Sequence, residues 1–309
     1  QRATVIEVHY PASRGAIGLR GFGGPLSWDE TTVPTRREGD VSVFELRLEE
    51  HELVELQLVR RRDGAAAEAE AEAEDWAAGR NLYAHSGDHI RVEPCFDRSA
   101  SQIVPNEPVL CAGLAEPVVF DVLLPPSYEE QDSRRYPVVY ALDGQSLWSF
   151  SSDPFGVWNL EITLDRLFEL GAIEEIIVVA LRTDRDRVAL LSPMPDPEHG
   201  GGLGPTFLAA ITDTIKPLVD GRFRTYTDRE NTGILGSSMG GLFAFFAAWT
   251  RPDVFGKVAC LSGSFWWAQR EMIKLVQTGA CPYPRPQFYI DSGASFDPAE
   301  QNPNLRDGF

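Results

Sequence analysis

The chain has 309 residues, of which 43% are hydrophobic and 24% charged, a composition typical of a globular protein with a full core. Lys and Arg number 28 against 46 for Asp and Glu, so the formal net charge is −18. A field of that sign repels nucleic-acid phosphates and anionic lipid surfaces, and no apolar run approaches the ~20 residues that span a bilayer. We therefore expect a soluble protein without nucleic-acid or membrane partners.

The first hundred residues show the pattern of short β-strands. Apolar and polar residues alternate in VSVFELRLE at 41–49 and in LVELQLVRR at 53–61, and Gly, Pro and Asp turns separate such stretches. This alternation is typical of strands that bury one face. We expect a small all-β sandwich domain over 1–100, followed by a proline-containing linker at 101–116.

From residue 117 onward, apolar strands alternate with amphipathic helices. The expected strands lie at 117–124, 137–144, 176–181, 232–236, 258–263 and 287–293, and the expected helices at 158–170, 205–223 and 240–250. Near-continuous apolar strands are those buried on both faces of a sheet. We therefore expect an α/β domain over 117–309, in which helices wrap a mostly parallel sheet.

The sequence GSSMG at 236–240 places Ser238 between two glycines, directly after one expected strand and at the start of a helix. Such a sharp turn holds the serine in a strained backbone conformation and presents its hydroxyl at the carboxyl edge of the sheet. The helix N-terminus also directs backbone N–H groups at a developing oxyanion. We interpret Ser238 as a nucleophile, and the alternative is a glycine-rich turn with a helix-capping serine.

Two longer stretches carry a family resemblance. GILGSSMGGLFAFFAAWTRPDVFGKVACLSGSFWW at 233–267 and VVYALDGQSLWSF at 138–150 resemble the esterase D group of α/β-hydrolases, and within it are most similar to enterochelin esterase-like hydrolases. The resemblance covers roughly 115–300. It implies an α/β-hydrolase fold and a serine carboxylic ester hydrolase with a Ser, Asp or Glu, and His triad, and we expect neither cofactor nor metal.

The resemblance also implies roles for particular residues. Ser238 matches the nucleophile, the backbone N–H of Met239 one oxyanion donor, and the loop at Gln145 the second. Asp297 best matches the triad acid, with Asp291 and Glu300 as alternatives. The matched aromatic residues would line the acyl or alcohol pocket, with core packing as the alternative; they are Trp148, Trp266 and Trp267.

The triad order places the histidine after the acid, but all five histidines precede Ser238: His9, His51, His85, His89 and His199. We therefore expect the catalytic histidine beyond Phe309. The alternatives are that His199 serves as the base, or that the enzyme is inactive. Arg187, in LRTDRDR after the strand at 176–181, is a candidate to bind an anionic substrate, with a solvated loop as the alternative.

The expected β domain resembles a starch-binding-type carbohydrate-binding module, on GLRGFGGPLSWDE at 18–30 and DWAAGRNLYAHSGDHIRVEPCF at 75–96. The resemblance implies Trp28 and Trp76 as sugar-stacking residues, with a lid or purely structural role as the alternative.

Together these features predict an ester hydrolase acting on a siderophore lactone or an acylated carbohydrate ester. The alternatives are an acyltransferase and a non-catalytic glycan-binding protein. The expected partner is a small-molecule ester, with a glycan as a further candidate. Because the chain begins at Gln1 without a signal segment, we expect a cytoplasmic location and keep secretion as the alternative.

Overall fold

The computed structural model describes residues 2–62, 74–97, 99–154 and 156–292. Contacts divide the chain into two compact units. Unit 1 holds Gln1–Ser101, Pro125–Arg134 and Thr163–Glu175, and unit 2 holds Gln102–Leu124, Arg135–Ile162 and the chain from Ile176 onward. Unit 1 therefore includes two segments that lie beyond the predicted boundary at residue 100. Among the described residues, no helix is both long and apolar enough to cross a bilayer.

The strands of unit 1 form two sheets. The first has the order β3-β4-β1-β8, and in the second β2, β5 and β6 lie side by side while β7 also pairs with β5. The strands are β1 (Arg2–His9), β2 (Ala16–Phe22), β3 (Arg36–Glu38), β4 (Val41–Leu48), β5 (Leu53–Arg61), β6 (Glu74–Trp76), β7 (Leu82–His85) and β8 (His89–Val92), with a short 3₁₀ helix, η1 (Ala12–Arg14), after β1. All neighbours pair antiparallel except β1 and β8, which run parallel.

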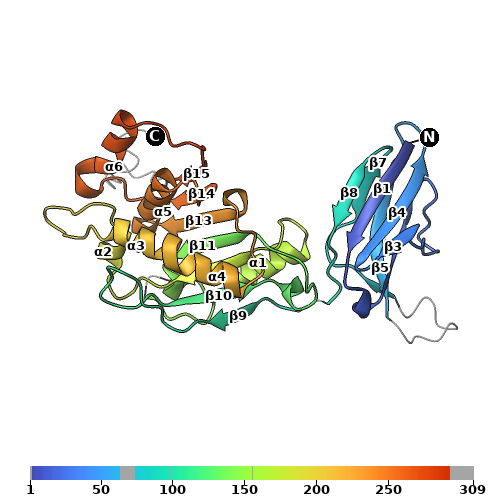
Figure 1. The fold of residues 1–309 in the computed structure, drawn as a ribbon, viewed down its shortest axis with the longest axis horizontal. Coiled ribbons are helices and arrows are strands. Elements are labelled where there is room, and N and C mark those ends of the chain that lie inside the picture. Colours follow the sequence, from blue (N-terminus) through green and yellow to red (C-terminus); the bar gives the residue numbers. More distant parts are fainter. Residues whose placement is uncertain (1, 63–73, 98, 155, 293–309) are drawn as a thin grey trace. The chain divides into compact units, whose positions relative to one another are not determined.

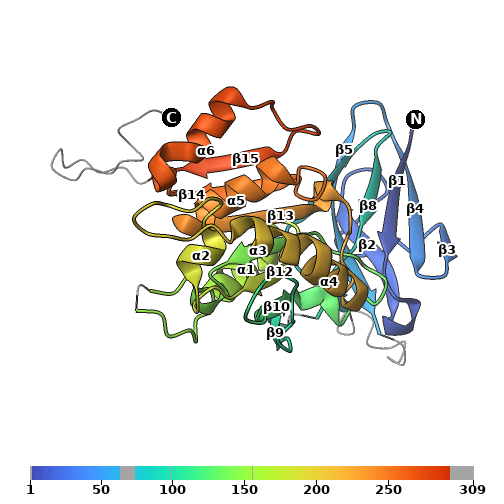
Figure 2. The same cartoon turned by 60° about the vertical axis from the view of Figure 1, so that its left-hand side comes forward.

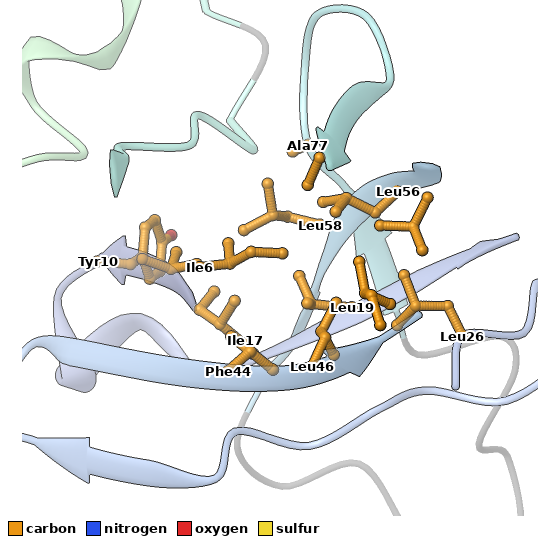
Figure 3. Packing of buried hydrophobic residues seen from close by; sticks show 14 of the residues in the cluster. Ile6, Tyr10, Ile17, Leu19, Leu26, Phe44, Leu46, Leu56, Leu58 and Ala77 are labelled. Carbon is orange, nitrogen blue, oxygen red and sulfur yellow. The ribbon is translucent and has the colours of Figure 1, made fainter. Parts of the chain in front are cut away.

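The core of unit 1 lies between these two sheets (Figure 3). Ile6 of β1 and Phe44 of β4 come from one sheet, and Leu19 of β2 and Leu58 of β5 from the other, and all four are at most 2% exposed. Alternate residues of a strand point to opposite faces, so the alternation in the sequence places these side chains inward. The predicted strands at 41–49 and 53–61 correspond to β4 and β5.

A buried carboxylate joins the segment Pro125–Arg134 to the strands of unit 1. Glu130 is 2% exposed and accepts hydrogen bonds from the Tyr10 hydroxyl at 2.7 Å and from the backbone N–H groups of Phe96 and Asp97. The Arg60 guanidinium lies 3.4 Å away. Because a buried carboxylate requires such partners, Glu130 fixes this segment to β1 and β5.

Unit 2 is built on one seven-stranded sheet of order β15-β14-β13-β11-β12-β10-β9 (Figure 1). The strands are β9 (Gln102–Pro105), β10 (Phe120–Leu124), β11 (Val138–Leu142), β12 (Ile177–Leu181), β13 (Thr232–Ser237), β14 (Lys257–Leu261) and β15 (Gln287–Asp291). The five strands from β11 to β15 run parallel, whereas β10 is antiparallel to both β12 and β9.

The predicted linker at 101–116 needs a correction. Residues 102–105 form the edge strand β9, which pairs with β10 in the sheet of unit 2. Three prolines at 105, 108 and 117 suggested a connection without strands, but Pro105 lies at the last position of an edge strand, where a missing N–H is tolerated. Propensity alone could not reveal this pairing, because the partner strand lies fifteen residues away in the sequence.

The helices are α1 (Leu160–Glu169), α2 (Arg187–Leu191), α3 (Gly204–Ala210), α4 (Lys216–Arg222), α5 (Met239–Thr250) and α6 (Trp267–Thr278). A π-helical turn, η5 (Ile211–Ile215), makes α3 and α4 continuous, and short 3₁₀ helices are η3 (Pro126–Tyr128), η4 (Gly144–Ser146) and η6 (Arg229–Asn231). Both views show α3, α4 and α5 on the same face of the sheet (Figures 1 and 2). Phe207 of α3 packs on Phe243 of α5 with ring centroids 5.3 Å apart, and α5 itself contacts β13 and β14 of the sheet.

Candidate active site

Ser238 occupies the sharp turn between β13 and α5. Its backbone angles are φ 57° and ψ −118°, a left-handed conformation that is costly for a residue with a side chain. The turn is held by the Ser238 N–H, which donates to the Leu261 carbonyl of β14 at 2.9 Å. Ser238 itself is exposed. The strained and accessible serine that the motif predicts is therefore present at the carboxyl edge of the sheet.

The turn closes so tightly that Gly236 must be a glycine. A Cβ atom at Gly236 would lie 2.5 Å from the backbone carbon and oxygen of Gly240, far inside any real contact distance. Gly233, at the other end of the same strand, has its nearest such neighbours at 3.5 Å. The close approach of strand and helix thus depends on the first glycine of GSSMG.

A second serine contacts the Ser238 hydroxyl. The Oγ atoms of Ser238 and Ser264 are 3.1 Å apart, and the Ser264 N–H donates to the Ser238 carbonyl at 3.0 Å. Ser264 is 3% exposed and follows β14. Our sequence reasoning did not assign Ser264 a role, although it lies within the SGSFWW segment that helped to carry the resemblance.

The two predicted oxyanion donors lie at the ends of neighbouring strands. Met239 is the first residue of α5, so its N–H belongs to the first turn, where amides have no acceptor within the helix. Gln145 lies in η4, directly after β11, and β11 pairs in parallel with β13. Both donors are therefore at the same edge of the sheet as Ser238. The side chain of Gln145 is engaged: its Oε1 accepts from the Thr183 N–H at 3.1 Å.

Arg187 is held by a carboxylate. Its Nε and Nη2 atoms donate to the two carboxylate oxygens of Asp143 at 2.7 and 2.8 Å, and Nη2 lies 3.4 Å from the Ser237 carbonyl oxygen. The hydrogen bonds that Arg187 donates to Asp143 raise the pKa of its guanidinium. Two nitrogens of the guanidinium are thus bound to Asp143. The sequence predicted either a substrate-binding role or a solvated loop for Arg187, and it did not indicate this ion pair.

The three candidate pocket tryptophans differ in exposure. Trp148 is 2% exposed and its indole N–H donates to Asp121 at 3.2 Å. Trp267 is 3% exposed and its indole N–H donates to the Met194 carbonyl at 2.8 Å. These two are core residues, as the alternative interpretation had it. Trp266 is 38% exposed and packs at 5.8 Å on the Trp267 ring, so its other surface is accessible.

The structure describes only part of the expected triad. Asp297 and Glu300 lie outside the described residues. Asp291 ends β15, and its Oδ1 accepts from the Ser262 N–H at 2.8 Å. His199 pairs through Nδ1 with Asp196 at 2.8 Å and lies 5.9 Å from the Trp267 ring. Within the described residues, no hydrogen bond joins His199 to Ser238, and no group of three metal-ligating side chains occurs.

A cavity of about 410 Å³ lies at this edge of the sheet, beside the ends of β10 and β12. Its walls include Val118, Thr183, Leu203 and Phe207. Ser238 is not among its lining residues. Thr183 links the cavity to Asp143, because it lines the cavity and its hydroxyl donates to the Asp143 carboxylate at 2.6 Å.

In unit 1, the two tryptophans predicted to bind sugar lie together. The Trp28 and Trp76 rings have centroids 6.2 Å apart and a tilt of 37°, and the Arg20 guanidinium lies 5.7 Å from the Trp76 centroid. Trp76 is 42% exposed. A protein-family match described below begins at residue 112 and does not reach them.

A mixed, mostly parallel sheet with a serine at a sharp strand-to-helix turn defines the α/β-hydrolase fold. Residues 112–306, more than half of the chain, match the family described as "Putative esterase". The chain therefore belongs to this esterase family.

Parts of the chain are also similar to individual proteins. The chain is 30% identical over 154 residues to the uncharacterized protein YbbA of Bacillus subtilis, covering 48% of this chain and 57% of that protein. It is 27% identical over 157 residues to the ferri-bacillibactin esterase BesA of Bacillus subtilis, covering 45% and 51%. The chain thus spans about half the length of these curated relatives. Among solved structures, an IroE-like serine hydrolase from Shewanella oneidensis matches at 25% identity and a TM-score of 0.47, covering 57% of this chain and 55% of that one.

Proposed function

We propose that this protein is a serine carboxylic ester hydrolase with Ser238 as its nucleophile. The observation that carries the proposal is the strained backbone of the exposed Ser238 between β13 and α5. Strain of this kind persists only where the surrounding structure enforces it, and it is common at catalytic sites. Membership of the esterase family supports ester hydrolysis as the reaction.

The proposed reaction proceeds through an acyl-enzyme. The Ser238 Oγ attacks the ester carbonyl carbon while a histidine takes the hydroxyl proton, and the tetrahedral oxyanion receives hydrogen bonds from the backbone N–H groups of Met239 and Gln145. The C–O bond to the alcohol then breaks, and the histidine returns the proton to the leaving oxygen. The histidine then takes a proton from water, and the water oxygen attacks the acyl carbon. The bond between that carbon and Ser238 Oγ breaks, the histidine returns the proton to Oγ, and the acid leaves.

The remaining triad members are proposed from their order in the chain. Asp297 would accept a hydrogen bond from the histidine and stabilise the imidazolium that forms. In the α/β-hydrolase order of Ser, acid and His, the histidine comes after the acid. All five histidines of this sequence come before Ser238. His199, paired with Asp196, is the alternative base, and its replacement by Ala is the direct test of that alternative.

We propose a siderophore lactone as the first substrate class and an acylated carbohydrate ester as the second. The first draws on the name of the bacillibactin esterase relative. Two facts weigh against a strongly anionic iron complex: the net charge of −18, and the pairing of Arg187 with Asp143. The second draws on Trp266, whose 38% exposed indole offers a stacking surface to a sugar. Comparing kcat/KM for a catecholate trilactone and an acetylated xyloside decides between them.

The proposal is tested by intact-mass spectrometry after exposure to a fluorophosphonate. We expect one adduct on the wild-type protein and none on Ser238→Ala, together with loss of p-nitrophenyl butyrate hydrolysis in the variant. Adding a sugar acceptor distinguishes acyl transfer, which would produce an acyl sugar in place of the free acid. A wild-type protein without adduct or hydrolysis would contradict the proposal.

A non-catalytic glycan-binding role is the second candidate, favoured by the contact between Trp28 and the exposed Trp76. It predicts that an α-glucan binds with an affinity that Trp76→Ala lowers and Ser238→Ala leaves unchanged. Calorimetric titration of both variants measures this, and equal binding by Trp76→Ala would remove the candidate.

A further inference from the structure

Asp143 has an unusual backbone conformation at a place that matters for the proposed reaction. It is the last residue before η4, the short helix that carries the predicted oxyanion donor Gln145. Its φ of 57° and ψ of 44° are left-handed, a conformation that few residues other than glycine adopt and that aspartate tolerates better than most. Such a residue keeps its conformation only if neighbouring groups hold it. The question is which groups hold Asp143.

Arg187 supplies the principal contact. The fork formed by its Nε and Nη2 atoms matches both oxygens of the Asp143 carboxylate, at 2.7 and 2.8 Å. A paired fork of this kind fixes orientation as well as distance. Thr183, four residues earlier in the loop between β12 and α2, adds a hydroxyl hydrogen bond of 2.6 Å to Asp143 Oδ1. This loop and the first residue of α2 therefore hold the loop after β11.

The same guanidinium also reaches the turn that carries the nucleophile. Arg187 Nη2 lies 3.4 Å from the carbonyl oxygen of Ser237, the residue directly before Ser238. The Asp143 carboxylate also lies close to this turn, since a Cβ atom at Gly240 would lie 3.3 Å from its Oδ2. One ion pair thus contacts both the segment 143–146, here called the oxyanion loop, and the segment 236–240, here called the serine turn.

We propose that Arg187 is a positioning residue for the ester hydrolysis proposed above, on which this inference rests: it fixes the oxyanion loop against the serine turn through Asp143 and the Ser237 carbonyl. An oxyanion is stabilised only by donors about 2.7–3.1 Å from the place where its charge develops. The two proposed donors come from the two separate segments, so their spacing depends on a group that contacts both. Arg187 is such a group.

This role differs measurably from the substrate-binding role that the sequence suggested. A residue that binds an anionic substrate changes KM, and only for substrates that carry the charge. A residue that sets the spacing of the oxyanion donors changes kcat, and does so for neutral and anionic esters alike, because the oxyanion forms in both.

The test uses a pair of esters and variants of two arginines. The natural full-length protein and its variants Arg187→Met, Arg187→Lys and Arg182→Met are assayed with neutral p-nitrophenyl butyrate and anionic p-nitrophenyl hemisuccinate. Arg182 is the matched control, because it lies in the loop that precedes Arg187 but pairs with Asp184 at the surface, where both side chains are more than 40% exposed. Arg182→Met removes the same charge without touching Asp143.

We expect Arg187→Met to lower kcat by about 10- to 100-fold on both esters, less than the loss of a whole oxyanion donor, with KM changed less than about twofold. Arg187→Lys should recover only part of this loss, because an ammonium cannot bridge both carboxylate oxygens. Two further variants, Arg187→Ala and Arg182→Ala, leave room for an added guanidinium, and millimolar methylguanidinium should raise the rate of the first but not of the second. Arg182→Met should match the wild type on the neutral ester.

Two results would overturn the inference. A loss confined to KM for the hemisuccinate would mean that Arg187 binds substrate, and wild-type kinetics in Arg187→Met would mean that it has no role. If Arg187→Met fails to fold, the double variant Asp143→Asn/Arg187→Lys is compared with its two single variants. If the two residues act together, the double variant loses no more kcat than the worse single variant. Losses in kcat that multiply would refute the coupling.

The failure of this inference is distinguishable from failure of the proposed function. If the wild-type protein shows no hydrolysis that depends on Ser238, the proposed function itself is wrong. If Ser238-dependent hydrolysis is present and the Arg187 variants retain it in full, only the positioning role is wrong.

Discussion

The hydroxyl of Ser264 lies 3.1 Å from the hydroxyl of Ser238, and its backbone N–H donates to the Ser238 carbonyl. The two serines come from the ends of adjacent parallel strands, β13 and β14. Ser264 is buried while Ser238 is exposed. The exposed hydroxyl of Ser238 is therefore in contact with a buried hydroxyl on its protein side.

We expect Ser264→Ala to lower kcat/KM about fivefold, because a single neutral hydrogen bond contributes about 1 kcal/mol. The rate of fluorophosphonate labelling at Ser238 should fall by a similar factor. Hydrolysis of p-nitrophenyl butyrate and labelling followed by mass spectrometry measure the two effects. Ser149→Ala, at an exposed serine, is the control, and an unchanged rate in Ser264→Ala would show that this contact does not orient the nucleophile.

Gly236→Ala should disrupt the serine turn, since its Cβ would lie 2.5 Å from the Gly240 backbone. Backbone atoms cannot yield as a flexible side chain can, so the turn must open. We expect loss of fluorophosphonate labelling by at least about 100-fold, the scale set by a misplaced oxyanion donor. Gly233→Ala in the same strand, where the nearest atoms are at 3.5 Å, should keep most of the activity. Equal behaviour of the two variants would be inconsistent with a steric requirement at Gly236.

Glu130→Gln should destabilise unit 1 by about 3 kcal/mol, the scale for removing one partner of a buried ion pair. An amide in place of the carboxylate turns an NH₂ group toward the N–H donors of Phe96 and Asp97 and weakens the attraction to Arg60. Burial and Glu130 raise the pKa of Tyr10, so the phenol stays a donor to this carboxylate through the neutral pH range.

The adjacent exposed residue provides the control for that change. Glu129→Gln should alter stability by less than about 0.5 kcal/mol, as surface substitutions do. Two measurements compare the variants: the midpoint of urea unfolding, and the protection of the β1 amides against hydrogen exchange in the native protein. A wild-type midpoint and wild-type protection in Glu130→Gln would show that the carboxylate does not hold the segment Pro125–Arg134.

The cysteines should differ strongly in reactivity. Burial raises the pKa of the Cys260 thiol to about 12, and burial together with Glu130 raises that of Cys95 further. Because the thiolate is the reactive form, a raised pKa leaves little of it at pH 8. Cys281 is exposed. Brief iodoacetamide treatment of the native protein should therefore modify Cys281 first, and Cys95 and Cys260 only in urea; peptide mass spectra that show Cys95 or Cys260 modified as fast would contradict these environments.

The sequence predicted the elements around Ser238 well. The expected strand at 232–236 and helix at 240–250 correspond to β13 and α5, and the strands at 137–144 and 176–181 correspond to β11 and β12. These elements are long or strongly apolar, so periodicity identifies them. The sequence did not reveal strand β9, because three prolines disfavour a strand there and its edge position, paired with β10, is set by the fold.

The sequence by itself determined the α/β character of the chain from residue 117 onward and the serine turn, because Gly236 allows a close approach of strand and helix that a Cβ atom would block. It did not determine which groups face the serine. That Ser264 contacts Ser238, that Arg187 pairs with Asp143, and that Trp148 and Trp267 are buried follow from the order of strands in the sheet. Strand order brings together loops that lie tens of residues apart, and pairing across such distances depends on packing that no local pattern encodes.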